Sequence, residues 1–204
     1  MRKRKQKETK HTLKRKDSLN FNRKRKKFDF RKSERIALLI MEIAAVLFLS
    51  FMTVEAFGMR LRVLGNSMEP TLYEGDTLLM NRIAYKIGSP HHNDVIVFRP
   101  SGNLNAQYSI KRVVGVPGDT VLIYNGVLYV NGERYRDFAD TDAIIEPGRA
   151  GTEIRLSDDE YFVLGDNRNS SEDSRYETIG NVSAKEIYGQ LYFNVTGERF
   201  GFIE

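Results

Sequence analysis

The feature that most constrains this chain is an uninterrupted apolar segment near its N-terminus. Residues 36–54 read IALLIMEIAAVLFLSFMTV, 19 residues with a single charge, Glu42. A helix of this length rises about 28 Å, close to the hydrocarbon thickness of a bilayer. The segment has no polar face, which argues against a buried helix of a soluble protein. The sequence therefore predicts a transmembrane helix over residues 36–56.

The charges that flank this segment predict its orientation. Residues 1–35 contain 17 Lys or Arg against 4 Asp or Glu, and only Arg60 and Arg62 follow the segment closely. The positive-inside rule then places the N-terminus in the cytoplasm and the C-terminal domain outside the cell membrane, a single-pass type II topology. We expect the basic tail, residues 1–35, to be disordered and held against anionic lipids rather than bound to nucleic acid.

Two targeting segments compete with this interpretation. Val54 and Ala56 have the −3 and −1 spacing of a cleavable secretory signal. The apolar core of such a signal runs about 7–15 residues, however, and this one is longer, so an uncleaved signal-anchor is favoured. An organelle transit peptide would be rich in Ser and poor in acidic residues, unlike this tail.

The composition of residues 58–204 differs from that of the tail. All 16 Gly and all 5 Pro lie at or after Gly58. These 147 residues are enough for an independent core. The absence of Cys excludes disulfides, thiolate zinc sites and a cysteine nucleophile. Three His in the whole chain argue against a multi-histidine metal centre.

Short β-branched and aromatic runs alternate with turn signals after Gly58, which is typical of strands. The predicted strands are residues 94–98, 108–114, 120–124, 127–130, 160–164 and 187–193. Asn125-Gly126 suits a type I′ hairpin turn, and Asn131-Gly132 suggests a second hairpin. Only residues 184–186 hint at a helical turn. The sequence thus predicts a mostly β domain over residues 57–204, either an antiparallel sheet or a partly open barrel.

A candidate nucleophile lies in the turn GNSMEPTL, residues 65–72. Such a turn can expose the Ser67 hydroxyl and point backbone N–H groups into the same space, as an oxyanion hole requires. Taken alone the signal is weak, because most turn serines are structural caps. A serine nucleophile also needs a base.

Two kinds of base are available in the sequence. His91 and His92 share a loop predicted to be exposed, but no recognisable spacing supports a Ser-His-Asp triad. Lys111 lies inside a predicted strand, where alternation puts it and Arg112 on opposite faces, one inward and one solvated. An inward lysine has a lowered pKa, so its neutral amine can accept a serine proton. From Lys111 alone, an exposed pair of basic residues on a strand is the favoured interpretation.

Four sequence boxes occur in order behind the apolar segment. They are GNSMEPTL at residues 65–72, DVIVF at 94–98, IKRVVGVPGD at 110–119 and GDNRNSSEDSR at 165–175. This arrangement resembles that of type I signal peptidases, in the single-anchor form typical of Gram-positive bacteria. The resemblance covers residues 36–193 and leaves out the basic tail and residues 133–158.

The resemblance implies a membrane-bound serine endopeptidase that removes signal peptides from exported preproteins. It implies that Ser67 is the nucleophile, that Lys111 is the general base and that the Ser67 backbone N–H forms part of the oxyanion hole. Some members add a serine hydroxyl two residues before the nucleophile. In this chain that position is Gly65, so the Asn66 side chain or a water has to substitute. No cofactor and no metal are implied, and the acidic last box does not fit the ligand spacing of an EF-hand.

The last box is expected to hold the surroundings of Lys111 in place, with Asp173 and Arg175 paired. Its members in this role are Asp166, Asn167, Ser171, Asp173, Ser174 and Arg175.

Signal peptides present small residues at positions −3 and −1, and in an extended strand these side chains share one face. Adding such a strand to a sheet edge gives backbone hydrogen bonds, while shallow pockets select small side chains. We expect the edges at residues 63–66 and 108–110. The expected substrate contacts are Val63, Leu64, Met68, Tyr108, Ser109 and Ile110. The expected partners are signal peptides and the bilayer, with no nucleic acid, and the protein is expected to be monomeric.

Two other functions stay open. One is a self-cleaving serine-lysine protease of the repressor type, which would be cytoplasmic, and the anchor argues against it. The other is a noncatalytic, signal-peptidase-like assembly chaperone anchored in the membrane. Such a chaperone could lose Ser67 or Lys111 without penalty, and both are present.

Overall fold

The structure is a computed structural model that describes residues 30–57, 59–100, 107–136 and 142–203. For Phe30, Glu198 and residues 55–57 it describes the backbone alone. The sequence predicts that the tail, residues 1–35, is disordered. Residues 1–29 of this tail lie outside the described residues. The chain divides into two compact units, residues 1–44 and 45–204, with the boundary inside the first helix.

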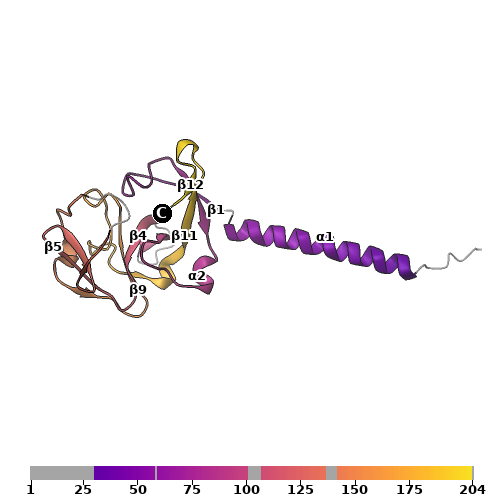
Figure 1. The fold of residues 1–204 in the computed structure, drawn as a ribbon, viewed down its shortest axis with the longest axis horizontal. Helices are drawn as coiled ribbons and strands as arrows, with labels where there is room; N and C mark the ends of the chain where they lie inside the picture. The colour runs from indigo at the N-terminus through magenta and orange to yellow at the C-terminus, as the bar shows by residue number, and fades with distance from the viewer. Residues whose placement is uncertain (1–29, 58, 101–106, 137–141, 204) are drawn as a thin grey trace, which may run out of the picture. The chain divides into compact units, whose positions relative to one another are not determined.

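The first helix, α1, spans Phe30–Phe57 and begins before the predicted residue 36 (Figure 1). Its stretch Arg31–Val54 is long and apolar enough to cross a membrane, by length and composition. The large apolar side chains along this stretch are exposed, for example Phe48 at 62% and Val54 at 65%. Exposed apolar side chains on every face are what a lipid-facing helix requires.

The larger sheet is antiparallel throughout and contains eight strands within the described residues. Its order is β1 (Met59–Arg62), β2 (Thr77–Asn81), β11 (Ile187–Asn194), β3 (Val95–Phe98), β4 (Ser109–Gly115), β9 (Glu160–Leu164) and β10 (Val182–Ser183), with β12 (Gly201–Phe202) paired to β11. Register shifts in β4 and β11 bend these strands, as β-bulges do. The result is a curled, open sheet, so the predicted fold class is confirmed.

A smaller antiparallel sheet has the order β7 (Glu133–Arg134), β6 (Val127–Val130), β5 (Thr120–Tyr124) and β8 (Ile154–Arg155). Figure 1 shows β4 and β9 between this sheet, marked by β5, and the end of the larger sheet that carries β1 and β12. The two hairpin turns are confirmed. Asn125 and Gly126 have φ of 50° and 77°, and Asn131 and Gly132 have φ of 54° and 79°, the left-handed values that type I′ turns need.

The helical segments of the described outer domain are short. They are α2 (Ala84–Ile87) and three 3₁₀ turns at Gly148–Gly151, Ala184–Glu186 and Gly197–Arg199. The turn at Ala184–Glu186 was the one that the sequence predicted, and Ser183 and Glu186 close a capping box at its start. The six predicted strands are present within one residue at each end. The sequence did not predict β1, β2, β7, β8, β10 or β12 as strands, and four of these six have two residues.

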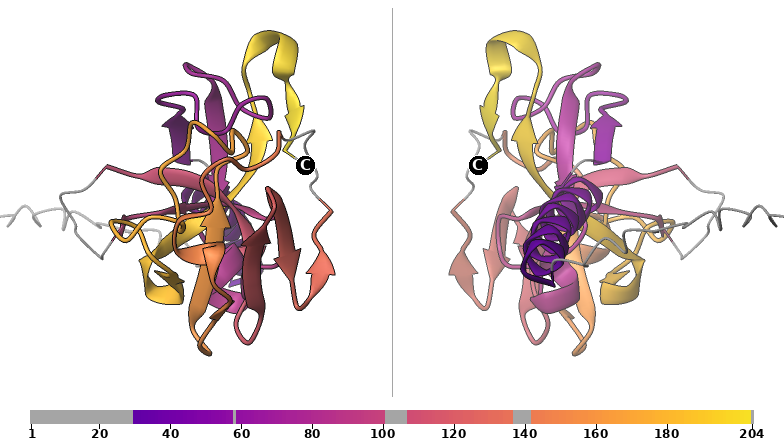
Figure 2. Two further views of the ribbon diagram at one scale, coloured as in Figure 1. Left: turned by 90° about the vertical axis from the view of Figure 1, so that its left-hand side faces the viewer. Right: turned by 90° about the vertical axis from the view of Figure 1, so that its right-hand side faces the viewer.

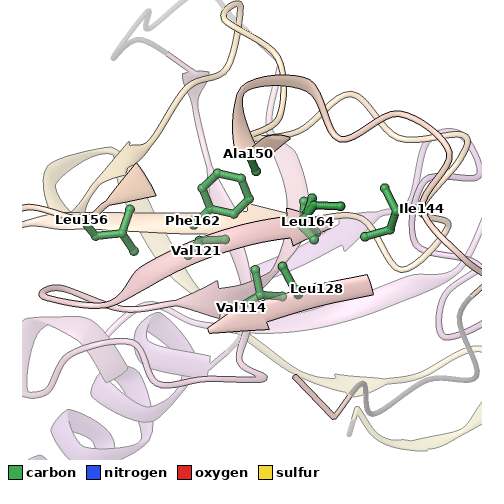
Figure 3. Close-up of a cluster of buried hydrophobic side chains, with 9 residues drawn as sticks. Val114, Val121, Leu128, Ile144, Ala150, Leu156, Phe162 and Leu164 are labelled. Carbon is green, nitrogen blue, oxygen red and sulfur yellow. The ribbon is translucent and has the colours of Figure 1, made fainter. Parts of the chain in front are cut away.

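Two of the buried clusters position the candidate site. One fills the space between the small sheet and strands β4 and β9, where Val121, Phe162 and Leu164 meet (Figure 3). The other lies under the Ser67 turn and includes Met68 and Leu72. The two views of Figure 2 show the larger sheet curling around its own axis rather than lying flat. The first cluster therefore supports β4, and the second supports the turn that carries Ser67.

Candidate active site

The Ser67 turn is held by its own backbone and by the core beneath it. Glu69 N donates to Asn66 O at 3.1 Å, and Leu72 N donates to Met68 O at 2.9 Å. The side chains of Met68 and Leu72 are each 1% exposed. Because Met68 and Leu72 are anchored in the core, the half-buried Ser67 is held within the turn that follows β1.

Lys111 reaches Ser67 from β4. Its Nζ donates a hydrogen bond to Ser67 Oγ at 2.8 Å. The Lys111 side chain is buried, and this burial lowers the pKa of its amine below the ordinary value, while the carboxylates of Asp173 and Glu172 oppose the shift. A lowered pKa raises the fraction of neutral amine at neutral pH. The pair therefore has the geometry and the environment of a nucleophile with its base.

Arg112, the next residue along β4, is buried as well, at 1% exposure. Its Nε and Nη2 donate to the two carboxylate oxygens of Asp166 at 2.8 and 2.7 Å, and its Nη1 donates to Asn93 O at 2.9 Å. The prediction that one residue of the Lys111–Arg112 pair stays solvated is wrong. Both faces of β4 are covered at this point, and the carboxylate of Asp166 takes the place of water on the second face.

The last box forms a loop after β9 whose buried side is built around one ion pair. Arg175 Nε donates to Asp173 Oδ1 at 2.8 Å, so the expected pairing is present, and both side chains are at most 1% exposed. Asp173 Oδ2 also accepts from Gly165 N at 3.1 Å. Ser174 Oγ accepts from Val163 N at 3.0 Å, which ties the loop to β9. The loop is thus a rigid neighbour of the site.

This loop also contacts the backbone at Ser67. Asn167 N donates to Ser67 O at 3.1 Å, and Asn167 Nδ2 donates to Asn66 O at 3.2 Å. Gly165 has no room for a side chain, because a Cβ there would overlap Ser67 O and Ser171 Oγ. The Ser171 hydroxyl is buried and has no hydrogen-bond partner among the described residues. Of the box residues, Asn167 thus contacts the backbone around Ser67, whereas Asp166 contacts Arg112 and Thr71.

The histidines take part in other contacts. His91 Nδ1 lies 3.9 Å from Asp94 Oδ2, and His92 Nε2 lies 2.7 Å from Asp119 Oδ2. Both histidines are exposed. Of the candidate bases, the structure brings Lys111 to Ser67 Oγ. The space beside Gly65, where some family members carry a serine hydroxyl, is open: a Cβ there would meet nothing within 4 Å.

A groove of about 430 Å³ runs past the pair. It is lined by all six predicted substrate contacts, Val63, Leu64, Met68, Tyr108, Ser109 and Ile110. Residues 109–111 of β4 pair with β3 on one side, while β9 pairs with β4 only from Arg112 onward. In the described part of the chain the other edge of residues 109–111 is therefore free of a strand.

Four further lining residues, Leu61, Arg62, Arg99 and Gln107, were not predicted from the sequence. Arg99 directly follows the DVIVF box, but no local pattern distinguishes a groove arginine from an exposed one at a strand end. Among the described residues, no group of three or more His, Cys, Asp or Glu is placed to hold a metal ion.

Comparison with known proteins gives one family. The family profile described as signal peptidase, peptidase S26, matches residues 33–196. The probable signal peptidase I-1 of Synechocystis sp. is 36% identical over 167 residues, which cover 78% of this chain and 80% of that protein. The probable signal peptidase I-2 of the same organism is 37% identical over 132 residues, 62% of this chain and 58% of that protein. A crystal structure of a signal peptidase I from Enterococcus faecalis V583 is 31% identical, with a TM-score of 0.41, and covers 51% of this chain and 97% of that one.

Proposed function

The chain belongs to the signal peptidase family, peptidase S26, and from this premise we propose that it is a membrane-bound serine endopeptidase that removes N-terminal signal peptides from exported preproteins. The observation that carries the proposal is the 2.8 Å hydrogen bond between Lys111 Nζ and Ser67 Oγ. A buried lysine beside a serine hydroxyl is the minimum that acyl transfer needs, a nucleophile and a base within hydrogen-bond reach.

In the first half-reaction, Ser67 Oγ attacks the carbonyl carbon of the peptide bond while its proton passes to Lys111 Nζ. The negative charge that develops on the carbonyl oxygen takes a hydrogen bond from the backbone N–H of Ser67. The C–N bond then breaks, and Lys111 gives the proton to the leaving amine, which becomes the N-terminus of the mature protein. The signal peptide stays attached to Ser67 as an ester.

In the second half-reaction, the neutral Lys111 takes a proton from a water molecule, which attacks the ester carbonyl. The ester bond breaks, Ser67 recovers its proton, and the signal peptide leaves with a new carboxylate. One lysine thus acts twice as base and twice as acid, which is why its lowered pKa matters for both steps.

A second hydrogen-bond donor to the oxyanion would occupy the open space beside Gly65. We assign it to the Asn66 side chain or to a bound water. The backbone carbonyl of Asn66 is already engaged by Asn167 Nδ2. That contact fixes the residue and leaves its side chain available for the oxyanion.

Substrate selection follows from the groove. A signal peptide laid along the free edge of residues 109–111 would pair with β4 as an added strand. Its alternate side chains at −1 and −3 would face walls that include Met68 and Ile110, both of which line the groove. Shallow apolar walls of this kind favour small side chains, so cleavage after an Ala-X-Ala-like segment is expected.

The membrane anchor completes the proposal. We place α1 across the cell membrane with the tail in the cytoplasm and the catalytic domain, residues 57–204, outside. Holding enzyme and substrate in one bilayer raises their effective concentration and sets the height of the cut. The enzyme acts as a monomer in this scheme.

The direct test is cleavage of a purified preprotein by the full chain in detergent, read by the mass and N-terminal sequence of the product. Ser67→Ala should lower turnover by at least about a thousandfold, as expected for the loss of a covalent nucleophile, with the fold unchanged by circular dichroism. Ser170→Ala, which alters an exposed serine of the loop after β9, serves as the matched control. An assembly chaperone would bind the preprotein without cutting it, and a repressor-type protease would cut its own chain.

A further inference from the structure

The charged side chains that line the groove are all positive. Its lining residues include three cationic side chains, Arg62, Arg99 and Lys111, and no Asp or Glu. Lys111 has a lowered pKa and serves as the base in the proposed function, so the permanent charges are those of the two arginines. A groove with unbalanced positive charge favours negative ligand groups and disfavours positive ones.

Arg99 is the arginine that the fold holds in a fixed position. Its Cζ lies 4.3 Å from the ring centroid of Tyr108 and 5.1 Å from that of Tyr188. The two rings meet edge to face with centroids 5.1 Å apart, and Arg99 Nη1 donates to Tyr188 Oη at 3.4 Å. Aromatic faces of this kind hold a guanidinium by cation–π attraction without neutralising it.

Arg99 also lacks the carboxylate partner that the buried Arg112 and Arg175 have. Arg112 and Arg175 each contact a carboxylate, at 2.7 and 2.8 Å. No carboxylate among the described residues forms an ion pair with Arg99, and its Nε is buried without a hydrogen-bond acceptor. The neighbouring residues 101–106 contain no Asp or Glu. A planar guanidinium is suited to bind a carboxylate with two parallel hydrogen bonds, so a ligand can supply what the protein does not.

The strand register gives the position of Arg99 along the groove. Phe98 pairs with Ser109, which places Arg99 level with Tyr108, three residues before Lys111. Three residues of a strand span roughly 10 Å. A substrate strand beside β4 advances by the same rise per residue. A substrate strand that runs in the direction of β4 with its −1 residue level with Lys111 therefore has its −4 residue level with Arg99 and its −5 residue next along, beyond the small residues at −1 and −3.

We propose that Arg99 makes the groove select an acidic side chain four or five residues before the cleavage site, at −4 or −5, and discriminate against Lys and Arg there. The inference rests on the proposed function, which seats the signal-peptide side of the substrate in this groove. It goes beyond that function because it adds a charge preference to the preference for small residues.

The experiment uses the full chain in detergent and quenched fluorescent peptides. All peptides share Ala-Gln-Ala at −3 to −1 and carry Glu, Gln or Lys at −4 or −5. The wild type should cleave the Glu peptide with a kcat/KM about tenfold above that of the Lys peptide, with Gln between, the ratio that one charge-assisted hydrogen bond can supply. Arg99→Gln should shrink the ratio to about twofold or less, and Arg99→Glu should reverse it.

The matched control is Arg155→Gln, which removes an exposed arginine from β8 of the small sheet, outside the groove. It should keep the full ratio. Arg62→Gln removes the other permanent charge of the groove, and a ratio lost with Arg62→Gln but kept with Arg99→Gln would overturn the assignment to Arg99. Circular dichroism checks each variant, and Arg99→Gln decides the question if Arg99→Glu does not fold.

Two failures are distinguishable. If the wild type cleaves all peptides equally well, or Arg99→Glu keeps the wild-type ratio, the inference about Arg99 is overturned and the proposed function stands. If the wild type cleaves no peptide, the proposed function falls and the inference falls with it. A charge preference confined to the mature side of the cut would also overturn the assignment of Arg99 to positions −4 and −5.

Discussion

Lys111 and Arg112 show two ways in which one strand can bury neighbouring cations. Arg112 has the carboxylate of Asp166 against it and donates two hydrogen bonds to that carboxylate. Lys111 has the neutral hydroxyl of Ser67 as its contact, and burial lowers its pKa. The guanidinium cannot lose its proton at any working pH, whereas the amine can. The order of the two residues along β4 therefore places the amine, and not the guanidinium, beside Ser67.

The lowered pKa of Lys111 predicts how activity depends on pH. An unperturbed lysine, with a pKa of about 10.4, is almost entirely protonated at pH 7 and cannot accept the serine proton. Lowering this pKa moves the acid limb of the pH–rate profile downward, so kcat/KM should rise with pH through the folded-state pKa of Lys111 and level off above it. A pH–rate profile on the full chain in detergent measures the limb.

Lys111→Arg should lower turnover by at least about a thousandfold while keeping the positive charge, because the guanidinium stays protonated. Lys185→Arg, at an exposed position in a 3₁₀ turn, is the matched control and should keep both turnover and the acid limb. An active Lys111→Arg enzyme would show that charge rather than proton transfer is the contribution of the lysine. The base would then have to be sought at His91 or His92.

At the scale of elements, the buried Arg112–Asp166 pair joins β4 to the loop after β9. Asp166 Oδ2 also accepts from Thr71 Oγ1 at 2.6 Å, so the same carboxylate reaches the segment that follows Ser67. Asp166→Ala leaves a buried, unpaired guanidinium and should lower the free energy of unfolding by about 3–5 kcal/mol. Chemical denaturation of the full chain in detergent, followed by circular dichroism, measures this loss.

The pair of the half-buried Arg149 and the exposed Glu177, 3.3 Å apart, gives the comparison. Glu177 is 85% exposed, so Glu177→Ala should cost less than about 1 kcal/mol. Equal losses for the two variants would mean that burial does not set the contribution of Asp166. A double variant, Arg112→Met with Asp166→Leu, should recover part of the loss, since it removes both buried charges together.

Gly165, which directly follows β9, brings that strand into contact with the Ser67 backbone. Gly165→Ala should push Ser67 O and Ser171 Oγ away and lower kcat by about a hundredfold, the usual result of moving a reacting group by about 1 Å. Gly201→Ala, where a Cβ would meet nothing within 4 Å, should have no effect. Turnover of one preprotein by both variants is the measurement, and normal turnover by Gly165→Ala would show that this contact does not position Ser67.

The strands that the sequence predicted are those with their own local signals. The β5–β6 hairpin is fixed by Asn125-Gly126, because few other dipeptides adopt two left-handed conformations in a row. The two-residue strands β8, β10 and β12 exist only through their partners, so no local pattern marks them. The burial of Arg112, beside the buried Lys111, was not predicted for a similar reason. Its cause is Asp166, which is 54 residues away in sequence.

At the scale of the whole molecule, the sequence divides the work between two dissimilar parts. Residues 1–57 supply a cluster of positive charge and an apolar helix, and contain no Gly or Pro. Residues 58–204 carry all the turn formers and a net charge of −6. The first part is suited to set position and orientation in a bilayer, and the second to build a site on rigid strands. Neither part needs the composition of the other, which is why each could be recognised from composition alone.

The last prediction concerns the orientation of the chain. The positive-inside rule counts Lys and Arg within about 15–20 residues of the membrane segment. Residues 23–35 contain eight Lys or Arg, and residues 2–15 contain eight more. External protease added to intact cells without a wall should digest the catalytic domain and leave the tail protected. Replacing the eight proximal Lys and Arg residues with Gln should expose the tail outside the cell in a large fraction of molecules. Arg60 and Arg62, which follow the helix closely, would then favour the opposite orientation.

Replacing the eight distal residues, 2–15, with Gln is the matched control, since it removes the same charge outside the counted range. We expect the orientation to survive in that variant. If both sets reversed the orientation equally, the total charge of the tail rather than its position would control insertion. If the catalytic domain of the wild type were protected from external protease, the domain would lie in the cytoplasm, where the signal peptides of exported proteins are not released, and the proposed function would fail with the topology.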